Sequence, residues 1–145
     1  LFIATVPGVV PYVSILRYHL ETLAGQDDES EMQSPGDFNF YVLEGASYTD
    51  EFGYDEFLTK LAAEHDNIHF VPTVSRPTEE KNAGWKGETG RVNTLTEKYI
   101  DKYGLKPEDT IVYACGNPQM IEDVKERLGG AGYQVEEERF WKDDD

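Results

Sequence analysis

The sequence contains a single cysteine, Cys115, so no disulfide can form within the chain. One thiol is also a poor basis for a structural zinc site, and no metal site is predicted. A lone cysteine fits a reducing compartment, and we expect a cytoplasmic location. No apolar run is long enough to span a membrane and no signal peptide is visible, so no membrane span is expected.

Basic residues are also scarce, because 13 lysines and arginines stand against 29 aspartates and glutamates, which gives a net charge of −16. A nucleic-acid partner is therefore excluded, since phosphate backbones are bound by clustered cations. The simplest interpretation of the charge is a well-solvated surface, of the kind that is also tuned for high salt. Hydrophobic residues make up 39% of the 145 residues, enough for one domain with a core.

The stretch from 110 to 128 is the most informative part of the chain. It opens with a short apolar run at 111–114, which is typical of a buried strand and is followed directly by Cys115. Gly116 breaks the run, Asn117 can cap a helix, and Pro118 suits its first turn. Four apolar residues then recur at helical spacing: Met120, Ile121, Val124 and Leu128.

Strands and helices alternate about five times along the chain. Strands are predicted over 1–5, 38–43, 68–74, 111–114 and 133–138, helices over 11–24, 54–65, 92–103 and 118–128, and loops over 25–36, 44–53 and 75–90. This pattern predicts an α/β fold, a three-layer α-β-α domain with a five-stranded parallel sheet and right-handed crossovers. Because the chain opens inside a core strand, we expect it to be a fragment of a longer protein.

Polar residues that suit a phosphate group follow the strand at 68–74. Ser75 and Arg76 come directly after this strand, at the carboxyl edge where ligands bind in an open α/β sheet. A hydroxyl beside a guanidinium suits a phosphate monoester, and Arg91 lies across the long loop where it can close on the same group. The alternative is that both arginines are surface residues that pair with the acidic protein.

Four short motifs give the chain a resemblance to the nucleotide-binding domain of the ferredoxin–NADP reductase family, particularly its bacterial ferredoxin or flavodoxin reductases. They are CGNPQM at 115–120, SRP at 75–77, GRV at 90–92 and ERFW at 138–141, in the family's order and at plausible spacing. The resemblance covers nearly the whole chain. It implies that Ser75, Arg76 and Arg91 hold the 2′-phosphate of NADP(H). Many bacterial members carry an arginine near Ser47, and its absence here weakens the expected preference for NADP without reversing it.

The resemblance also assigns a pyrophosphate site to the turn after the first strand. Thr5, Gly8 and Pro11 match the usual pattern, whereas Val6 and Pro7 depart from it. Val6 adds bulk where backbone should approach phosphate, and Pro7 removes an N–H donor, so we expect a tighter pocket or weaker binding. A plain strand-to-helix turn is the alternative.

For Cys115, the residue itself suggests a small buried apolar side chain, whereas the resemblance places it beside the nicotinamide ring. Its role there is positional, because no neighbouring base is predicted to activate it as a nucleophile. The resemblance adds Gly116, Asn117, Pro118 and Met120 to the cofactor-binding residues. It also implies that Phe140 and Trp141 pack against FAD held by a preceding domain; from sequence alone, these aromatics equally suit a hydrophobic cap.

The function implied by the resemblance is hydride transfer between NADPH and FAD, with single electrons exchanged with ferredoxin or flavodoxin. No FAD-binding barrel or flavin motif is present in these 145 residues, so we expect this chain alone to be inactive without its FAD-binding domain. One alternative is a diverged docking or structural module with weak or no nucleotide binding. Another is the NADH-linked reductase component of an oxygenase system.

Overall fold

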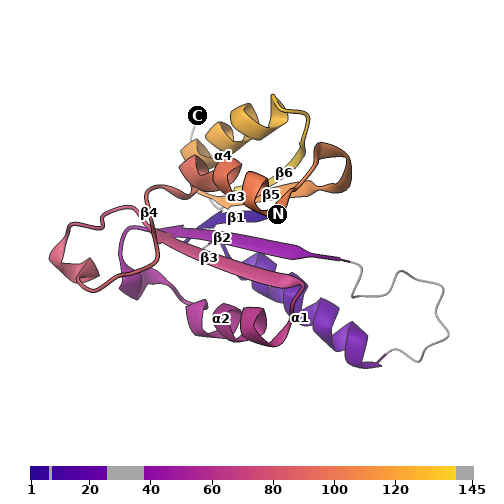
Figure 1. The fold of residues 1–145 in the computed structure, drawn as a ribbon, viewed down its shortest axis with the longest axis horizontal. Coiled ribbons are helices and arrows are strands. Elements are labelled where there is room, and N and C mark those ends of the chain that lie inside the picture. Colours follow the sequence, from indigo (N-terminus) through magenta and orange to yellow (C-terminus); the bar gives the residue numbers. More distant parts are fainter. Residues whose placement is uncertain (7, 26–37, 140–145) are drawn as a thin grey trace.

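A computed structural model describes residues 1–6, 8–25 and 38–139 of the protein. Within these residues, six strands form one parallel sheet in the order β4-β3-β2-β1-β5-β6 (Figure 1). The strands are β1 (Phe2–Thr5), β2 (Phe40–Ala46), β3 (Ile68–Val74), β4 (Glu88–Thr89), β5 (Ile111–Gly116) and β6 (Gln134–Arg139). The predicted α/β class is confirmed.

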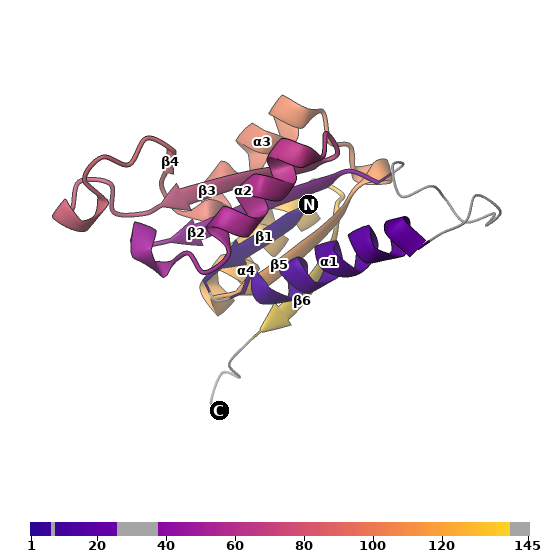
Figure 2. The same ribbon diagram turned by 90° about the horizontal axis from the view of Figure 1, so that it is seen from below.

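Helices cover both faces of the sheet, as Figures 1 and 2 show. The helices are α1 (Val10–Gly25), α2 (Asp55–Glu64), α3 (Thr96–Tyr103) and α4 (Pro118–Val124), and α4 continues as a π-helical turn over Lys125–Gly129. Side chains alternate between two cores, because successive strand residues point to opposite faces. Phe2 and Val42 pack with α1 and α2, whereas Ile3 and Leu43 pack with α3 and α4.

Three segments differ from the sequence prediction. The sheet has six strands instead of five, because β4 lies inside the segment 75–90 that was expected to be a loop. With only two residues, β4 is too short to give a periodic pattern. β2 begins later than expected, at Phe40. It also ends later, at Ala46, because the strand continues through the carboxylate residue Glu44 and through Gly45. The helix expected at 92–103 begins as a 3-10 turn, Val92–Leu95, before α3.

The strand order places a change of direction in the middle of the sheet. The chain builds outward from β1 through β2 to β4 and then returns to add β5 and β6 on the other side of β1. In parallel α/β sheets, ligands bind in the crevice outside the carboxyl ends of the strands near such a point. The fold therefore predicts a ligand site at the carboxyl ends of β1 and β5 and the loops beside them.

The helices that the structure describes, over 1–6, 8–25 and 38–139, are too short or too polar to cross a lipid bilayer.

Candidate functional site

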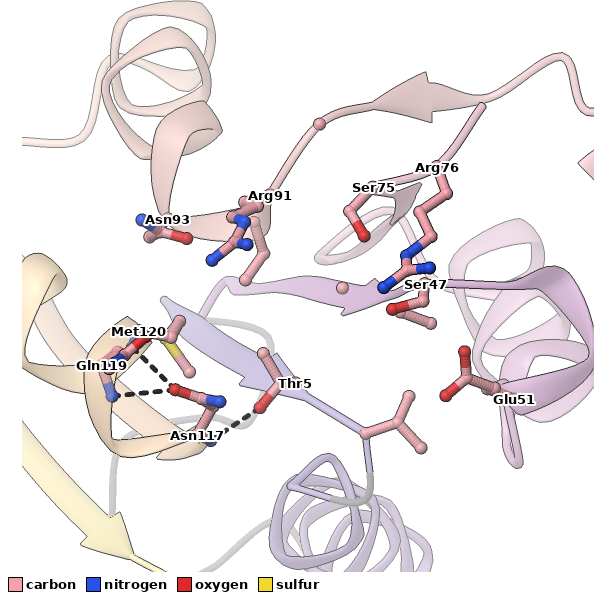
Figure 3. A pocket seen from close by; sticks show the side chains of 15 residues that line it. Thr5, Ser47, Glu51, Ser75, Arg76, Arg91, Asn93, Asn117, Gln119 and Met120 are labelled. Carbon is pink, nitrogen blue, oxygen red and sulfur yellow. Dashed lines mark hydrogen bonds between the residues drawn. The ribbon is translucent and has the colours of Figure 1, made fainter. Parts of the chain in front are cut away.

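A cavity of about 420 Å³ lies at the carboxyl edge of the sheet (Figure 3). The ends of β1, β2 and β3, the turn after β4 and the start of α4 all contribute to it. Its lining residues are Thr5, Val6, Gly45, Ala46, Ser47, Glu51, Ser75, Arg76, Gly90, Arg91, Val92, Asn93, Asn117, Gln119 and Met120. The volume falls within the range of cavities that hold small molecules and cofactors.

The cavity brings together six of the residues singled out from the sequence: Thr5, Ser75, Arg76, Arg91, Asn117 and Met120. Four others lie next to it without lining it: Gly8, Cys115, Gly116 and Pro118. Trp141, expected to contact FAD, and Pro7 lie outside the described residues. Sequence reasoning did not single out Glu51, Asn93 or Gln119, and it named Ser47 only for the arginine that is missing there.

The two arginines reach the cavity from separate loops. Arg76 follows β3, and Arg91 follows β4 and directly precedes the Val92–Leu95 turn. Figure 3 shows both guanidinium groups on the rim of the same cavity, with that of Arg76 beside Ser47. The short strand β4 explains this meeting, because it pairs with the end of β3 and so returns the long loop to the site.

Arg76 already has partners within the protein. Its Nη1 donates to Glu79 Oε1 and to Tyr48 Oη, each at 3.2 Å, and its guanidinium lies 5.6 Å from the centre of the Tyr48 ring. The hydrogen bond to Glu79 and the Tyr48 contact raise the pKa of Arg76. The alternative interpretation, a surface arginine paired with an acidic residue, therefore describes part of the environment of Arg76. Arg91, in contrast, makes no side-chain hydrogen bond or ion pair with any described residue.

At the opposite end of the cavity, β1 and β5 are joined through a side chain. Thr5 Oγ1 accepts a hydrogen bond of 2.8 Å from the backbone N–H of Asn117. Gly116 has φ of 124°, a conformation that favours glycine, and a Cβ at this position would overlap Thr5 Oγ1. At Gly8, a Cβ would lie 2.7 Å from the carbonyl oxygen of Thr5. These two glycines allow the strand ends to approach closely.

The turn into α4 is fixed by Asn117. Its Oδ1 accepts hydrogen bonds from the backbone N–H groups of Gln119 at 2.8 Å and Met120 at 3.3 Å. This is the helix cap that the sequence predicts.

A second amide, Asn93, donates to Asp123 Oδ2 at 2.5 Å, and this carboxylate also accepts from Arg127 Nε at 2.6 Å. Both amides are thus held in place where they line the cavity.

Cys115 lies on β5, just before the turn into α4, and is buried in the core. Its side chain is 1% exposed and packs among the apolar residues under α1. Burial raises the pKa of the thiol to about 11, and Glu138 adds to the shift. The thiol is therefore neutral at physiological pH, which suits packing and does not suit nucleophilic attack.

The donor set of the cavity fits an anionic dinucleotide such as NAD(P)H. Figure 3 shows the Arg76 guanidinium with the hydroxyls of Ser47 and Ser75 at one end of the cavity and the Arg91 guanidinium beside Asn93. The Thr5 hydroxyl and the Asn117 amide lie together at the end of β1 and the start of α4. Val6 does line the cavity, so the bulk expected from the sequence is present. Glu51 is the one lining carboxylate among the described residues, and its Oε1 accepts from the Tyr48 backbone N–H at 2.8 Å.

Comparison with known proteins places the chain in a family. A family model described as "oxidoreductase NAD-binding domain" matches residues 2–126. A subunit of the Na(+)-translocating NADH-quinone reductase of Yersinia enterocolitica is 38% identical over 101 residues, which cover 69% of this chain and 24% of that protein. The corresponding subunit from Serratia proteamaculans is 34% identical over 119 residues, covering 81% of this chain and 28% of that protein. The chain thus spans about a quarter of the length of these relatives.

Solved structures with the same fold include reductases. A ferredoxin NADP+ reductase from Neisseria gonorrhoeae, solved with bound FAD and NADP, has a TM-score of 0.68 at 23% identity and covers 97% of this chain and 55% of that one. The cytochrome b5 reductase domain of Ulva prolifera nitrate reductase has a TM-score of 0.69 at 21% identity, covering 94% and 47%. The chain belongs to the oxidoreductase NAD-binding domain family, and its resemblance to the ferredoxin–NADP reductase type of nucleotide-binding domain is confirmed.

Proposed function

We propose that this chain is the NADP(H)-binding domain of a ferredoxin–NADP reductase-like flavoenzyme. FAD, bound by another domain, would exchange a hydride with the nicotinamide and pass single electrons to or from ferredoxin or flavodoxin. This chain would bind the nucleotide and orient its ring. The cytoplasmic location expected from the lone cysteine stays a prediction.

One observation carries this proposal: Arg76 and Arg91, from separate loops, share the rim of one cavity with Ser47 and Ser75. Guanidinium and hydroxyl donors together suit the dianionic 2′-phosphate that distinguishes NADP from NAD. Arg91 is the stronger of the two candidates, because its guanidinium has no partner among the described residues and is free to bind an anion.

Thr5 and Asn117 would face the middle of the nucleotide, and Gly116 and Cys115 would frame the nicotinamide. The support for this assignment is the junction of β1 and β5, where Thr5 is bonded to the Asn117 backbone. Cys115 would act by packing, since its thiol is neutral and buried.

A second candidate, an NADH-linked reductase domain, is favoured by the contacts of Arg76. Glu79 already pairs with Arg76. The family resemblance implies a further arginine near Ser47, and this chain has none there. The relatives from Na(+)-translocating NADH-quinone reductases point in the same direction. We prefer NADP(H), because in a complex with NADH there would be no 2′-phosphate for Arg91 and Ser75 to bind.

Calorimetric titration of the full chain with NADP⁺ and NAD⁺ tests the proposal. We expect NADP⁺ to bind about tenfold more tightly, and Arg91→Ala to remove most of that difference, as charge-assisted hydrogen bonds of roughly 1.5–3 kcal/mol imply. Arg17→Ala is the matched control, because Arg17 lies on α1 with its guanidinium 4.6 Å from the centre of the Phe57 ring, outside the cavity lining. Equal affinity for the two nucleotides would favour the NADH-linked candidate, and binding of neither would favour a docking module.

A further inference from the structure

A buried asparagine, Asn82, connects two loops of the candidate site from outside the cavity. It lies on the 3-10 turn Glu80–Asn82, within a loop whose other residues are mostly exposed, yet only 2% of Asn82 is exposed. It is not one of the residues that line the cavity.

The amide of Asn82 bonds to three backbone groups. Its Nδ2 donates to the carbonyl oxygens of Ser47 at 2.9 Å and Arg76 at 2.8 Å, and its Oδ1 accepts from the Thr49 N–H at 3.0 Å. Ser47 and Thr49 belong to the loop after β2, whereas Arg76 belongs to the loop after β3. One side chain therefore satisfies polar groups in both loops.

These bonds begin where the backbone ladder between β2 and β3 ends. The backbone hydrogen bond at the end of this ladder runs from the Ser75 N–H to the Ala46 carbonyl at 2.9 Å. The contact between Arg76 and Tyr48 also joins the loops, but it is exposed, whereas the hydrogen bonds of Asn82 are partly buried and constrain geometry more strongly. Asn82 itself is fixed, because its N–H donates to the Glu79 carbonyl at 2.9 Å.

We propose that Asn82 is the positioning residue that sets the spacing of Ser47 and Arg76 and thereby the discrimination between a 2′-phosphate and a 2′-hydroxyl. This inference rests on the proposed function. A 2′-phosphate held by both Ser47 and Arg76 would contact the loop after β2 and the loop after β3 at once, so its binding would depend on the distance between these loops. Under the proposed function, the rest of the dinucleotide would lie towards Thr5 and Asn117, where Asn82 makes none of its side-chain hydrogen bonds.

The test measures the ratio of the NAD⁺ and NADP⁺ dissociation constants in the full chain. Asn82→Ala removes all three bonds, whereas Asn82→Asp keeps the acceptor for Thr49 and loses both donors. We expect each variant to lower the ratio about fivefold or more, the effect of roughly one buried hydrogen bond, while NAD⁺ affinity stays within about twofold. Asn67→Ala is the matched control, because Asn67 donates to the Phe38 carbonyl at the opposite edge of the sheet.

A double-mutant cycle separates positioning from general loosening of the fold. In an Arg76→Ala background, Asn82→Ala should change the ratio less than about twofold, because the residue that it positions is gone. An unchanged ratio in the Asn82 variants, or an equal loss in both backgrounds, would overturn the inference and leave the proposed function intact. Failure of the unmodified chain to prefer NADP⁺ would instead overturn the proposed function, and this inference with it.

Hydrogen exchange on the unmodified chain supplies a second measurement that needs no variant to fold. NADP⁺ should slow exchange of the Thr49 amide, which donates to Asn82, about fivefold more than NAD⁺ does, because the phosphate holds together the loops that Asn82 joins. Equal protection by both nucleotides would contradict the inference.

Discussion

Replacing the buried Glu44 with glutamine should make the protein more stable at neutral pH and leave it unchanged in acid. Glu44 lies in the middle of the sheet on β2, is 0% exposed, and has no hydrogen-bond partner among the described residues for either carboxyl oxygen. Burial, followed by the nearby charge of Asp55, raises its pKa from 4.5 to about 7. The side chain is therefore protonated in the native state over a range where it is ionised in the unfolded chain.

The sign and size of the effect follow from proton linkage. Between about pH 4.5 and pH 7, the native state binds one proton more than the unfolded state, so the free energy of unfolding falls as the pH rises. A difference of about 2.5 pKa units corresponds to roughly 3 kcal/mol, lost gradually across this window and constant above it. For 145 residues, this free energy corresponds to about 10 °C in melting temperature.

Urea and thermal unfolding at pH 5 and pH 8 measure the effect. Glu44→Gln should match the parent at pH 5 and exceed it by about 3 kcal/mol at pH 8, because glutamine cannot ionise. Glu56→Gln, on the exposed face of α2, is the matched control for the loss of one carboxyl group. A Glu44→Gln advantage that is the same at both pH values would refute the reasoning.

Other predictions test the packing and the charges of the site. Gly8→Ala should destabilise the protein by about 3 kcal/mol in urea unfolding, because the new Cβ would overlap backbone atoms of Thr5 and Cys115. Gly53→Ala should be nearly neutral, because a Cβ there would have no atom within 4 Å, and equal effects of the two substitutions would contradict this packing. Cys115 should react with a thiol reagent at pH 8 about a hundredfold more slowly in the native than in the unfolded state, and a native rate close to the unfolded one would refute its burial. Glu79→Gln should raise NADP⁺ affinity about twofold to fivefold by releasing Arg76, with less gain at high salt; an unchanged affinity in calorimetry would show that Glu79 does not compete with the nucleotide.

The sequence allowed the strand β5, its turn and α4 to be predicted closely, because each has a local cause. A β-branched run ends at a glycine, and Asn117 caps the helix with its own side chain. The meeting of Arg76 and Arg91 followed from the rule that parallel strands end at one edge, together with the family resemblance. Their neighbouring strand β4 was not predicted, because two residues carry no periodicity.

The residues that were missed depend on contacts between distant segments. Asn82 looks like any polar residue in a charged loop, and only the fold brings it against Ser47 and Arg76. Glu44 was expected in a loop, because a carboxylate is a poor residue for the middle of a sheet. The pairing of Arg76 with Glu79 was foreseen only as a general alternative, since the local spacing does not say which acidic residue is used.

The most direct test of the central claim is a crystal structure of the full chain with NADP⁺. We predict that oxygens of the 2′-phosphate lie about 3 Å from the guanidinium groups of both Arg76 and Arg91, with the nicotinamide beside Cys115. A nucleotide whose 2′-phosphate points into solvent, away from both arginines, would contradict the account.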